Sequence, residues 1–92
     1  MIKSFAHKGL EVFFCDDSKR GIQPKHAEKL ALILDRLAAA SQVKDMAYPG
    51  SDFHPLKGRL KGFWAVSVSG NWRVIFRIDG GDAYEVGYVD YH

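Results

Sequence analysis

Two histidines are the residues of this 92-residue chain best suited to moving protons. Imidazole has an unperturbed pKa of about 6.5, so it takes and gives protons at neutral pH. His54 precedes a proline, which holds it extended and out of a helix. His92 follows a predicted strand directly, which would fix it beside the loop of His54. Asp90 and the terminal carboxylate would orient the His92 ring or favour its protonated form. The pair therefore indicates general acid–base chemistry.

Cations gather in the segment that begins next to His54. Residues 53–78 contain no Asp or Glu, although the chain has 11 acids in all. Guanidinium and ammonium groups suit phosphate oxygens, and such contacts hold a nucleic-acid backbone rather than read its bases. The formal net charge of +2 hides the segment, because acids elsewhere cancel the total. The segment predicts an anion site formed by Lys57, Arg59, Lys61, Arg73 and Arg77.

Plainer explanations stand beside these hypotheses. Arg73 and Arg77 would equally occupy the solvated side of a half-exposed sheet. A metal site made by two histidines and a carboxylate is disfavoured because no close ligand pair occurs, and no cofactor is expected. Cys15 lies beside acids that oppose thiolate formation, so packing explains it better than catalysis. His7 and His26 fall in or near predicted helices and are most simply structural.

The elements expected to position these residues form an α+β domain. Hydrophobic periodicity predicts an N-terminal strand, two helices and an antiparallel meander, with the helices on one face of the sheet. Pro49, Gly50 and Pro55 interrupt regular structure, so a long loop is expected to carry His54. The expected ranges are a strand at 2–5, helices at 8–16 and 24–40, a helical turn at 43–48, a loop at 49–62, and strands at 62–69, 72–78 and 83–89, with a hairpin turn at 70–71.

Alternation along the strands sorts the side chains between the two faces of the sheet. Trp72, Val74 and Phe76 are expected to face the helices, while Arg73 and Arg77 lie on the opposite, open face, a candidate groove. Trp72 could instead stack on a base, but core packing is the simpler explanation. The helix residues expected to be buried are Leu10, Phe13 and Phe14 in the first helix and Ala27, Leu30, Ala31, Leu34, Leu37 and Ala38 in the second.

Length and composition fit one globular domain, residues 1–92, with 47% hydrophobic residues. No apolar run approaches the roughly 18 to 20 residues needed to cross a bilayer. Residues 1–5 lack the apolar centre of a signal peptide. The single cysteine fits a reducing compartment. A cytoplasmic protein without a membrane partner is expected.

Three separated motifs resemble the HigB toxins, often labelled plasmid maintenance system killer proteins, of the RelE/ParE superfamily. They are His-Pro-Leu-Lys-Gly at 54–58, Asn-Trp-Arg at 71–73 and Asp-Tyr-His at 90–92. The motifs agree in order and spacing, and the resemblance runs from end to end of the chain, including residues 1–5 and 80–84. It implies a microbial-RNase-like RelE/ParE fold, with an N-terminal strand and two helices packed on one face of an antiparallel sheet.

The function implied by the resemblance is that of a toxin of a type II toxin–antitoxin system. Such toxins cleave messenger RNA in the A site of the 70S ribosome without a metal, and the implied partner is a HigA-type helix-turn-helix antitoxin. Attack of the ribose 2′-hydroxyl on the adjacent phosphate is the leading chemical hypothesis. The catalytic residues implied by the resemblance are His54, Asp90, Tyr91 and His92, with Lys57 and Arg73 as phosphate-facing cations. The full set expected to bind RNA is Lys57, Arg59, Lys61, Asn71, Arg73 and Arg77, in which Arg59 and Lys61 belong to a segment where the family varies.

Two other functions remain open at this point. A ParE-like toxin would bind DNA gyrase without cutting RNA, although the paired histidines oppose this reading. A plain RNA-binding or ribosome-binding module would use the same cations for affinity alone. Which histidine is the acid and which is the base is also left open.

Overall fold

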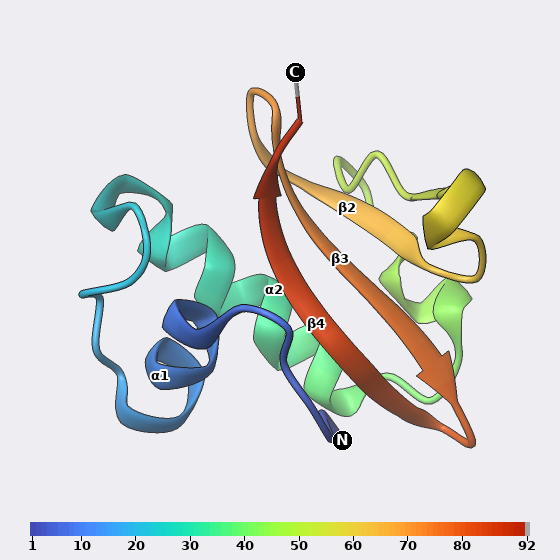
Figure 1. The fold of residues 1–92 in the computed structure, drawn as a ribbon, viewed down its shortest axis with the longest axis horizontal. Helices are drawn as coiled ribbons and strands as arrows, with labels where there is room; N and C mark the ends of the chain where they lie inside the picture. The colour runs from blue at the N-terminus through green and yellow to red at the C-terminus, as the bar shows by residue number, and fades with distance from the viewer. Residues whose placement is uncertain (92) are drawn as a thin grey trace.

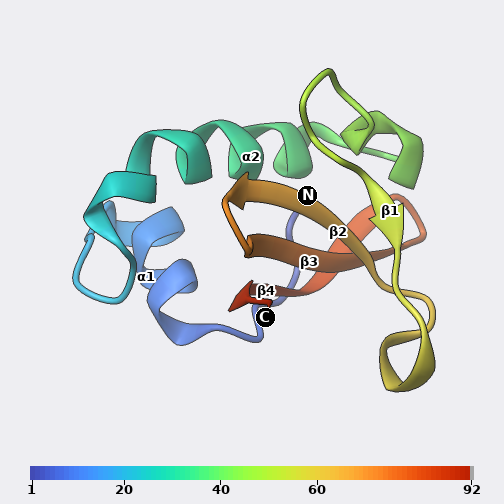
Figure 2. The ribbon, with the colours of Figure 1, turned by 90° about the horizontal axis from the view of Figure 1, so that it is seen from above.

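Two helices pack against one face of a four-stranded antiparallel sheet in the computed structural model, which describes residues 1–91 (Figures 1 and 2). The strands lie in the order β1-β2-β3-β4, so each strand pairs with the next along the chain. The predicted α+β class is confirmed. The elements are α1 (Lys8–Asp16), α2 (Ala27–Ala39), β1 (His54–Pro55), β2 (Trp64–Ser69), β3 (Trp72–Asp79), β4 (Asp82–Asp90) and 3-10 turns at Pro24–His26, Val43–Met46 and Gly58–Leu60.

Helix α1 has the bounds that the sequence predicts, and both of its ends are capped. The His7 side chain accepts a hydrogen bond from the Leu10 amide at 3.0 Å. At the other end Asp17 adopts a left-handed conformation, with φ of 58°, and its amide donates to the Phe13 carbonyl. Leu10 and Phe13 are buried as expected, but Phe14 is 39% exposed, so its predicted place in the core was wrong.

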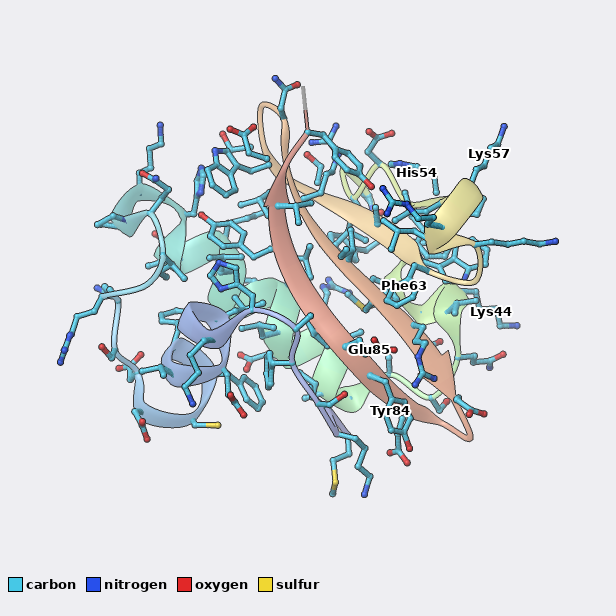
Figure 3. The ribbon with its side chains drawn as sticks, viewed as in Figure 1. Lys44, His54, Lys57, Phe63, Tyr84 and Glu85 are labelled. Carbon is cyan, nitrogen blue, oxygen red and sulfur yellow. The ribbon has the colours of Figure 1, made fainter. Side chains whose placement is uncertain are left out.

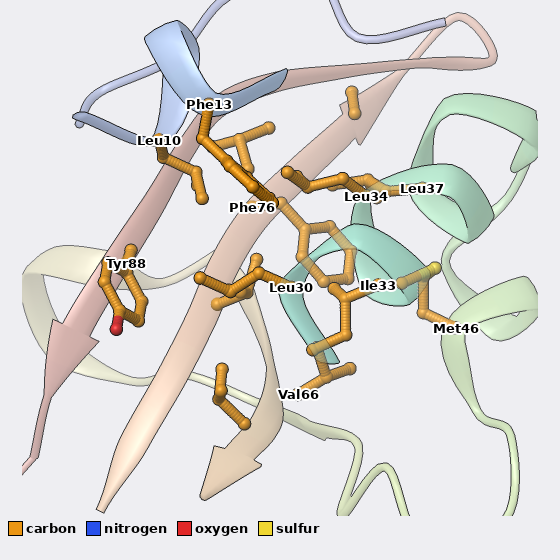
Figure 4. Packing of buried hydrophobic residues seen from close by; sticks show 14 of the residues in the cluster. Leu10, Phe13, Leu30, Ile33, Leu34, Leu37, Met46, Val66, Phe76 and Tyr88 are labelled. Carbon is orange, nitrogen blue, oxygen red and sulfur yellow. The ribbon is translucent and has the colours of Figure 1, made fainter. Parts of the chain in front are cut away.

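Helix α2 begins one turn after Pro24, because the residues 24–26 form a 3-10 turn. Leu30, Leu34 and Leu37 are buried as predicted, whereas Ala31 is exposed. Ile33, which the predicted stripe omitted, is only 1% exposed. Figure 4 shows why: Ile33 points toward Met46 from the following 3-10 turn, which widens the buried side of the helix.

The core lies between these helices and the inner face of the sheet (Figure 4). Val74 and Phe76 from β3 are fully buried in it, as strand alternation predicts. The outer face differs from the open groove that was expected, because its centre is closed. Ala65 and Ile75, neighbours across β2 and β3, are 0% and 8% exposed. The two arginines of β3 are consequently separated by a buried row.

Residues 2–5 do not form the strand predicted for them. The segment runs parallel to β4 and makes isolated bridges, Ile2 with Ala83 and Phe5 with Val86. The ladder breaks at Glu85, which has a φ of 53° and whose amide donates to the Ser4 hydroxyl at 2.8 Å. At the same point the pairing of β3 and β4 shifts register. A bulged partner strand cannot support continuous pairing, so only separate bridges form.

The stretch predicted as a long loop, residues 49–62, contains a short strand. In β1, His54 pairs with Ala65 and Pro55 with Trp64. The Phe53 and Trp64 rings stack with centroids 4.7 Å apart. Pairing of a Pro residue at a sheet edge is permitted because its missing amide faces away from the ladder. His54 is therefore carried by the sheet edge.

The chain returns toward α1 through a close backbone approach. A Cβ atom placed on Gly9 would lie 2.4 Å from the Gly21 carbonyl oxygen, and one on Gly21 would lie 2.4 Å from the Gly9 Cα. Only glycine fits at such a crossing. In the described residues, no helix is long and apolar enough to span a bilayer.

Candidate active site

The second and third motifs meet at one end of the sheet. Trp72 pairs with Asp90 across β3 and β4, and the Tyr91 amide donates to the Asn71 carbonyl at 2.8 Å. This contact joins the last described residue to the β2–β3 hairpin turn. The first motif lies along the edge strand on the same sheet. His92, predicted to be catalytic, lies outside the described residues.

His54 is oriented by a main-chain contact. Its Nδ1 lies 2.8 Å from the Asp52 carbonyl oxygen. A carbonyl oxygen only accepts hydrogen bonds, so Nδ1 is the donor and carries a proton. In the neutral ring Nε2 is then the unprotonated nitrogen. The ring therefore offers Nε2 for proton transfer.

Arg73 is held against the hairpin that precedes it. Its Nη1 donates to the carbonyls of Gly70 at 2.7 Å and Trp72 at 3.0 Å. Its Nη2 lies 3.7 Å from the Asp52 carboxylate, and the side chain is only 16% exposed. The Nε atom is buried without a hydrogen-bond partner. This guanidinium has a fixed position at the same end of the sheet as Tyr91.

Asp52 connects the two residues just described, although it was not among the predicted site residues. Its main chain contacts His54 and its carboxylate contacts Arg73. No motif includes it, and it lies one residue outside the acid-free segment. The turn-forming run at residues 49–52 indicated a loop, but not that the loop would reach Arg73.

Lys57, Arg59 and Lys61 extend from the turn that follows β1 and are exposed. Lys57 and Arg59 line an open cavity of about 490 Å³ together with Leu60. Among the described residues, no carboxylate lies within ion-pair distance of these three cations. Figure 3 shows His54 and Lys57 at the same end of the molecule. Lys57 of the first motif and the two cations that follow the motif thus place positive charge in the turn next to β1.

Arg77 is not brought together with this group. Its Nε donates to Glu85 at 2.8 Å, and its guanidinium lies over the Tyr84 ring, 4.7 Å from the centroid. The hydrogen bond to Glu85 is the main cause that raises the pKa of Arg77. Tyr84 and Glu85 belong to β4, at the opposite edge of the sheet from His54 in β1, and Figure 3 shows them apart from His54. A segment without acids in the sequence is therefore not free of acids in space.

The other histidines are structural, as predicted. His26 is buried, and its Nδ1 is hydrogen-bonded to the Tyr88 hydroxyl at 2.6 Å. Trp72 stacks on Tyr88 with centroids 4.6 Å apart, which confirms its predicted role in packing. Burial, and then the charge of Lys25, lowers the pKa of His26. The rings of His26 and Trp72 therefore both belong to the core that supports the second motif.

Metal-ligating residues do not gather in this region. Across residues 1–91, no three His, Cys, Asp or Glu side chains are grouped closely enough to hold a metal ion. What the arrangement offers is an imidazole with a free Nε2, a fixed guanidinium and several exposed cations. These groups suit proton transfer beside a bound phosphate.

Comparisons with known proteins point to one family. A model described as the RelE-like toxin of type II toxin-antitoxin system HigB matches residues 3–92. The chain is 36% identical over 92 residues to a Proteus vulgaris protein named Endoribonuclease HigB, covering 100% of both chains. It is 35% identical over 94 residues to Toxin HigB-1 of Vibrio cholerae, covering 100% of this chain and 98% of that one. The solution structure of the conserved hypothetical protein HP0894 from Helicobacter pylori is similar in fold, with a TM-score of 0.51 at 18% identity, covering 96% of this chain and 94% of that one.

Proposed function

Because the chain belongs to the HigB-like toxins of type II toxin–antitoxin systems and is by homology an endoribonuclease, we propose that it cuts messenger RNA in the ribosomal A site. The reaction is attack of a ribose 2′-hydroxyl on the adjacent phosphate, without a metal. It leaves a 2′,3′-cyclic phosphate on one fragment and a 5′-hydroxyl on the other. The proposed framework is the microbial-RNase-like form of the α+β fold.

The site residues divide the chemistry between proton transfer and charge stabilisation. His54, through Nε2, performs one of the two proton transfers, and His92, assisted by Asp90, performs the other. Lys57 and Arg73 contact the non-bridging phosphate oxygens, where charge develops in the transition state. Tyr91 stacks on a base or bonds a phosphate. Arg59 and Lys61, from the turn between β1 and β2, and Asn71, from the turn at the other end of β2, contribute to RNA binding.

One observation supports this proposal most. Asp52 links His54, with its Nδ1 at 2.8 Å, to Arg73, with its Nη2 at 3.7 Å. A proton-transfer group and a phosphate-binding group are thus joined through one residue, beside the turn to which Tyr91 is bonded. Arg77 is left out of the proposed site because it is paired with Glu85.

A toxin of this type has an antitoxin partner. We propose that the partner is a HigA-type helix-turn-helix protein that binds the toxin and represses their shared operon. The 70S ribosome and its message are the other partners. Since translating ribosomes are the target, the protein acts in the cytoplasm.

Mapping the 5′ ends of transcripts after induction tests the function. We expect discrete cuts within translated codons, and purified protein that cuts ribosome-programmed message in preference to naked message. His54→Gln is expected to lower the cleavage rate by about 10² to 10⁴, because glutamine cannot exchange a proton at neutral pH. His92→Gln is expected to lower cleavage while leaving ribosome binding largely intact.

The rival functions give different outcomes in the same experiment. Intact message with damaged DNA would favour a ParE-like gyrase-binding toxin. Intact message and intact DNA, with retained ribosome binding, would favour a plain binding module. Near-normal cleavage by both histidine variants would remove the acid–base assignment while leaving the nuclease function in place.

A further inference from the structure

Asp52 contacts two residues of the proposed site and lies outside all three motifs. Its carbonyl oxygen is 2.8 Å from His54 Nδ1, and its carboxylate is 3.7 Å from Arg73 Nη2. We propose that Asp52 is a positioning residue for RNA cleavage: its carbonyl holds the His54 ring in the tautomer that presents Nε2, and its carboxylate aligns the Arg73 guanidinium. This inference rests on the proposed function, in which His54 and Arg73 act on RNA.

The main chain that leads into Asp52 is held in place by two hydrogen bonds of Ser51. Ser51, only 2% exposed, donates its amide to the Tyr48 carbonyl at 3.0 Å and accepts the Ser67 amide at 2.7 Å. Asp52 itself has a φ of 50°, in the left-handed region. Aspartate tolerates this region better than most residues, and a β-branched side chain tolerates it poorly. The direction of the Asp52 carbonyl is therefore set by a backbone conformation that depends on the residue type.

This carbonyl selects between the two neutral forms of His54. With the proton on Nδ1 the contact is a hydrogen bond, whereas with the proton on Nε2 two lone pairs would face each other. The first form leaves Nε2 able to accept a proton from a hydroxyl group. If the carbonyl turned away, the ring would lose both its preferred tautomer and its orientation.

The carboxylate acts on the other component of the site. Arg73 Nη1 is already occupied by the carbonyls of Gly70 and Trp72. Asp52 supplies the contact on Nη2, so both terminal nitrogens of the guanidinium are anchored. The Asp52 side chain is 68% exposed, and the ion pair is long, so its effect on Arg73 is modest.

Two substitutions separate these contributions. Asp52→Gly keeps the left-handed backbone and the carbonyl but removes the carboxylate. Asp52→Val removes the carboxylate and also opposes the backbone conformation. Asp17 provides a matched control, because it is exposed, has a φ of 58° and ends α1 on the far side of the molecule from β1 (Figures 1 and 2). Asp17→Gly and Asp17→Val therefore report the general cost of the same changes.

The first measurement is single-turnover cleavage of message on programmed ribosomes. Relative to Asp17→Val, Asp52→Val is expected to lose at least about tenfold in rate, because the proton-transfer group is displaced. Asp52→Gly is expected to lose only about two- to fivefold relative to Asp17→Gly, as fits an exposed ion pair. An Asp52→Val rate within about twofold of the Asp17→Val rate would overturn the positioning role.

The second measurement is the imidazole nitrogen NMR spectrum of His54 at a pH where the ring is neutral. We expect the proton on Nδ1 in the unchanged protein and in Asp52→Gly, but not in Asp52→Val. A proton on Nε2 in the unchanged protein would overturn the inference even if Asp52→Val failed to fold. An unchanged protein that cuts no message would overturn the proposed function, and the positioning role with it. An active unchanged protein with an equally active Asp52→Val would overturn the positioning role alone.

Discussion

The hydroxyl of Tyr88 offers a sharp test of how the core supports the site. Tyr88 is 4% exposed, and its hydroxyl lies 2.6 Å from the Nδ1 of His26, which is 3% exposed, and 3.4 Å from the Gln23 amide. Tyr88→Phe removes one oxygen and leaves the ring in place. The His26 nitrogen then loses its partner in a site that water does not reach. The contact with Gln23 is near the distance limit for a hydrogen bond, so its loss contributes little.

The cost is that of leaving a buried polar atom unpaired, about 1 to 3 kcal/mol in the free energy of unfolding. In a domain of this size each kcal/mol shifts the melting temperature by roughly 4 to 8 °C. We therefore expect Tyr88→Phe to melt about 5 to 20 °C lower. Cleavage measured where both proteins are folded is expected to change little, because the Tyr88 ring still stacks on Trp72.

Urea unfolding followed by tryptophan fluorescence measures the change, and Tyr84→Phe is the matched control. Tyr84 lies on the same strand, and within residues 1–91 its hydroxyl makes no hydrogen bond. The control is expected to stay within about 0.5 kcal/mol of the unchanged protein. Equal stability of Tyr88→Phe and Tyr84→Phe would refute the reasoning that the buried hydroxyl is needed.

Three further changes test charge and pH. Burial keeps the pKa of His26 below its ordinary value of 6.5. The unfolded chain therefore binds more protons than the folded one below about pH 6.5, and the free energy of unfolding falls as the pH drops through that window. Urea titrations at about pH 7.5 and 5.5 are expected to show this fall, and a smaller one in His26→Gln. Lys57→Ala is expected to reduce the slope of log affinity for the ribosome against log salt concentration by about one unit. Lys29→Ala, at a remote position, is the control. An equal slope in the two variants would contradict the phosphate contact of Lys57. Glu85→Gln, which unpairs Arg77, is expected to change stability little, because the ion pair is exposed, and to leave cleavage unchanged. A large change in cleavage rate would return Arg77 to the site.

Local patterns predicted most of the elements that carry the site. The spacing of Leu10 and Phe13 placed α1 correctly, and the turn at residues 70–71 between alternating segments placed the β2–β3 hairpin. These features depend on neighbours in the chain, where periodicity and turn chemistry act directly. The face assignment of Val74 and Phe76 followed from the same local rule.

Features that depend on distant partners were not predictable in this way. Residues 2–5 make only isolated bridges because their partner strand, β4, bulges at Glu85, some eighty positions further along the chain. Arg77 seemed part of a cationic group until β4 brought Glu85 beside it. Asp52 looked like a loop residue, because its role requires both its left-handed backbone and the position of Arg73. The proposed catalytic roles themselves stay predictions.

The crossing of Gly9 and Gly21 bears on how cells would escape such a toxin. Neither position has room for a methyl group, since a Cβ atom on either glycine would lie 2.4 Å from the main chain of the other. A bacterium that expresses the toxin without its antitoxin survives only by disabling it. Selection for survivors is therefore expected to recover substitutions at these two glycines alongside those at His54, and the glycine variants would be recognised by loss of folded protein rather than by loss of chemistry.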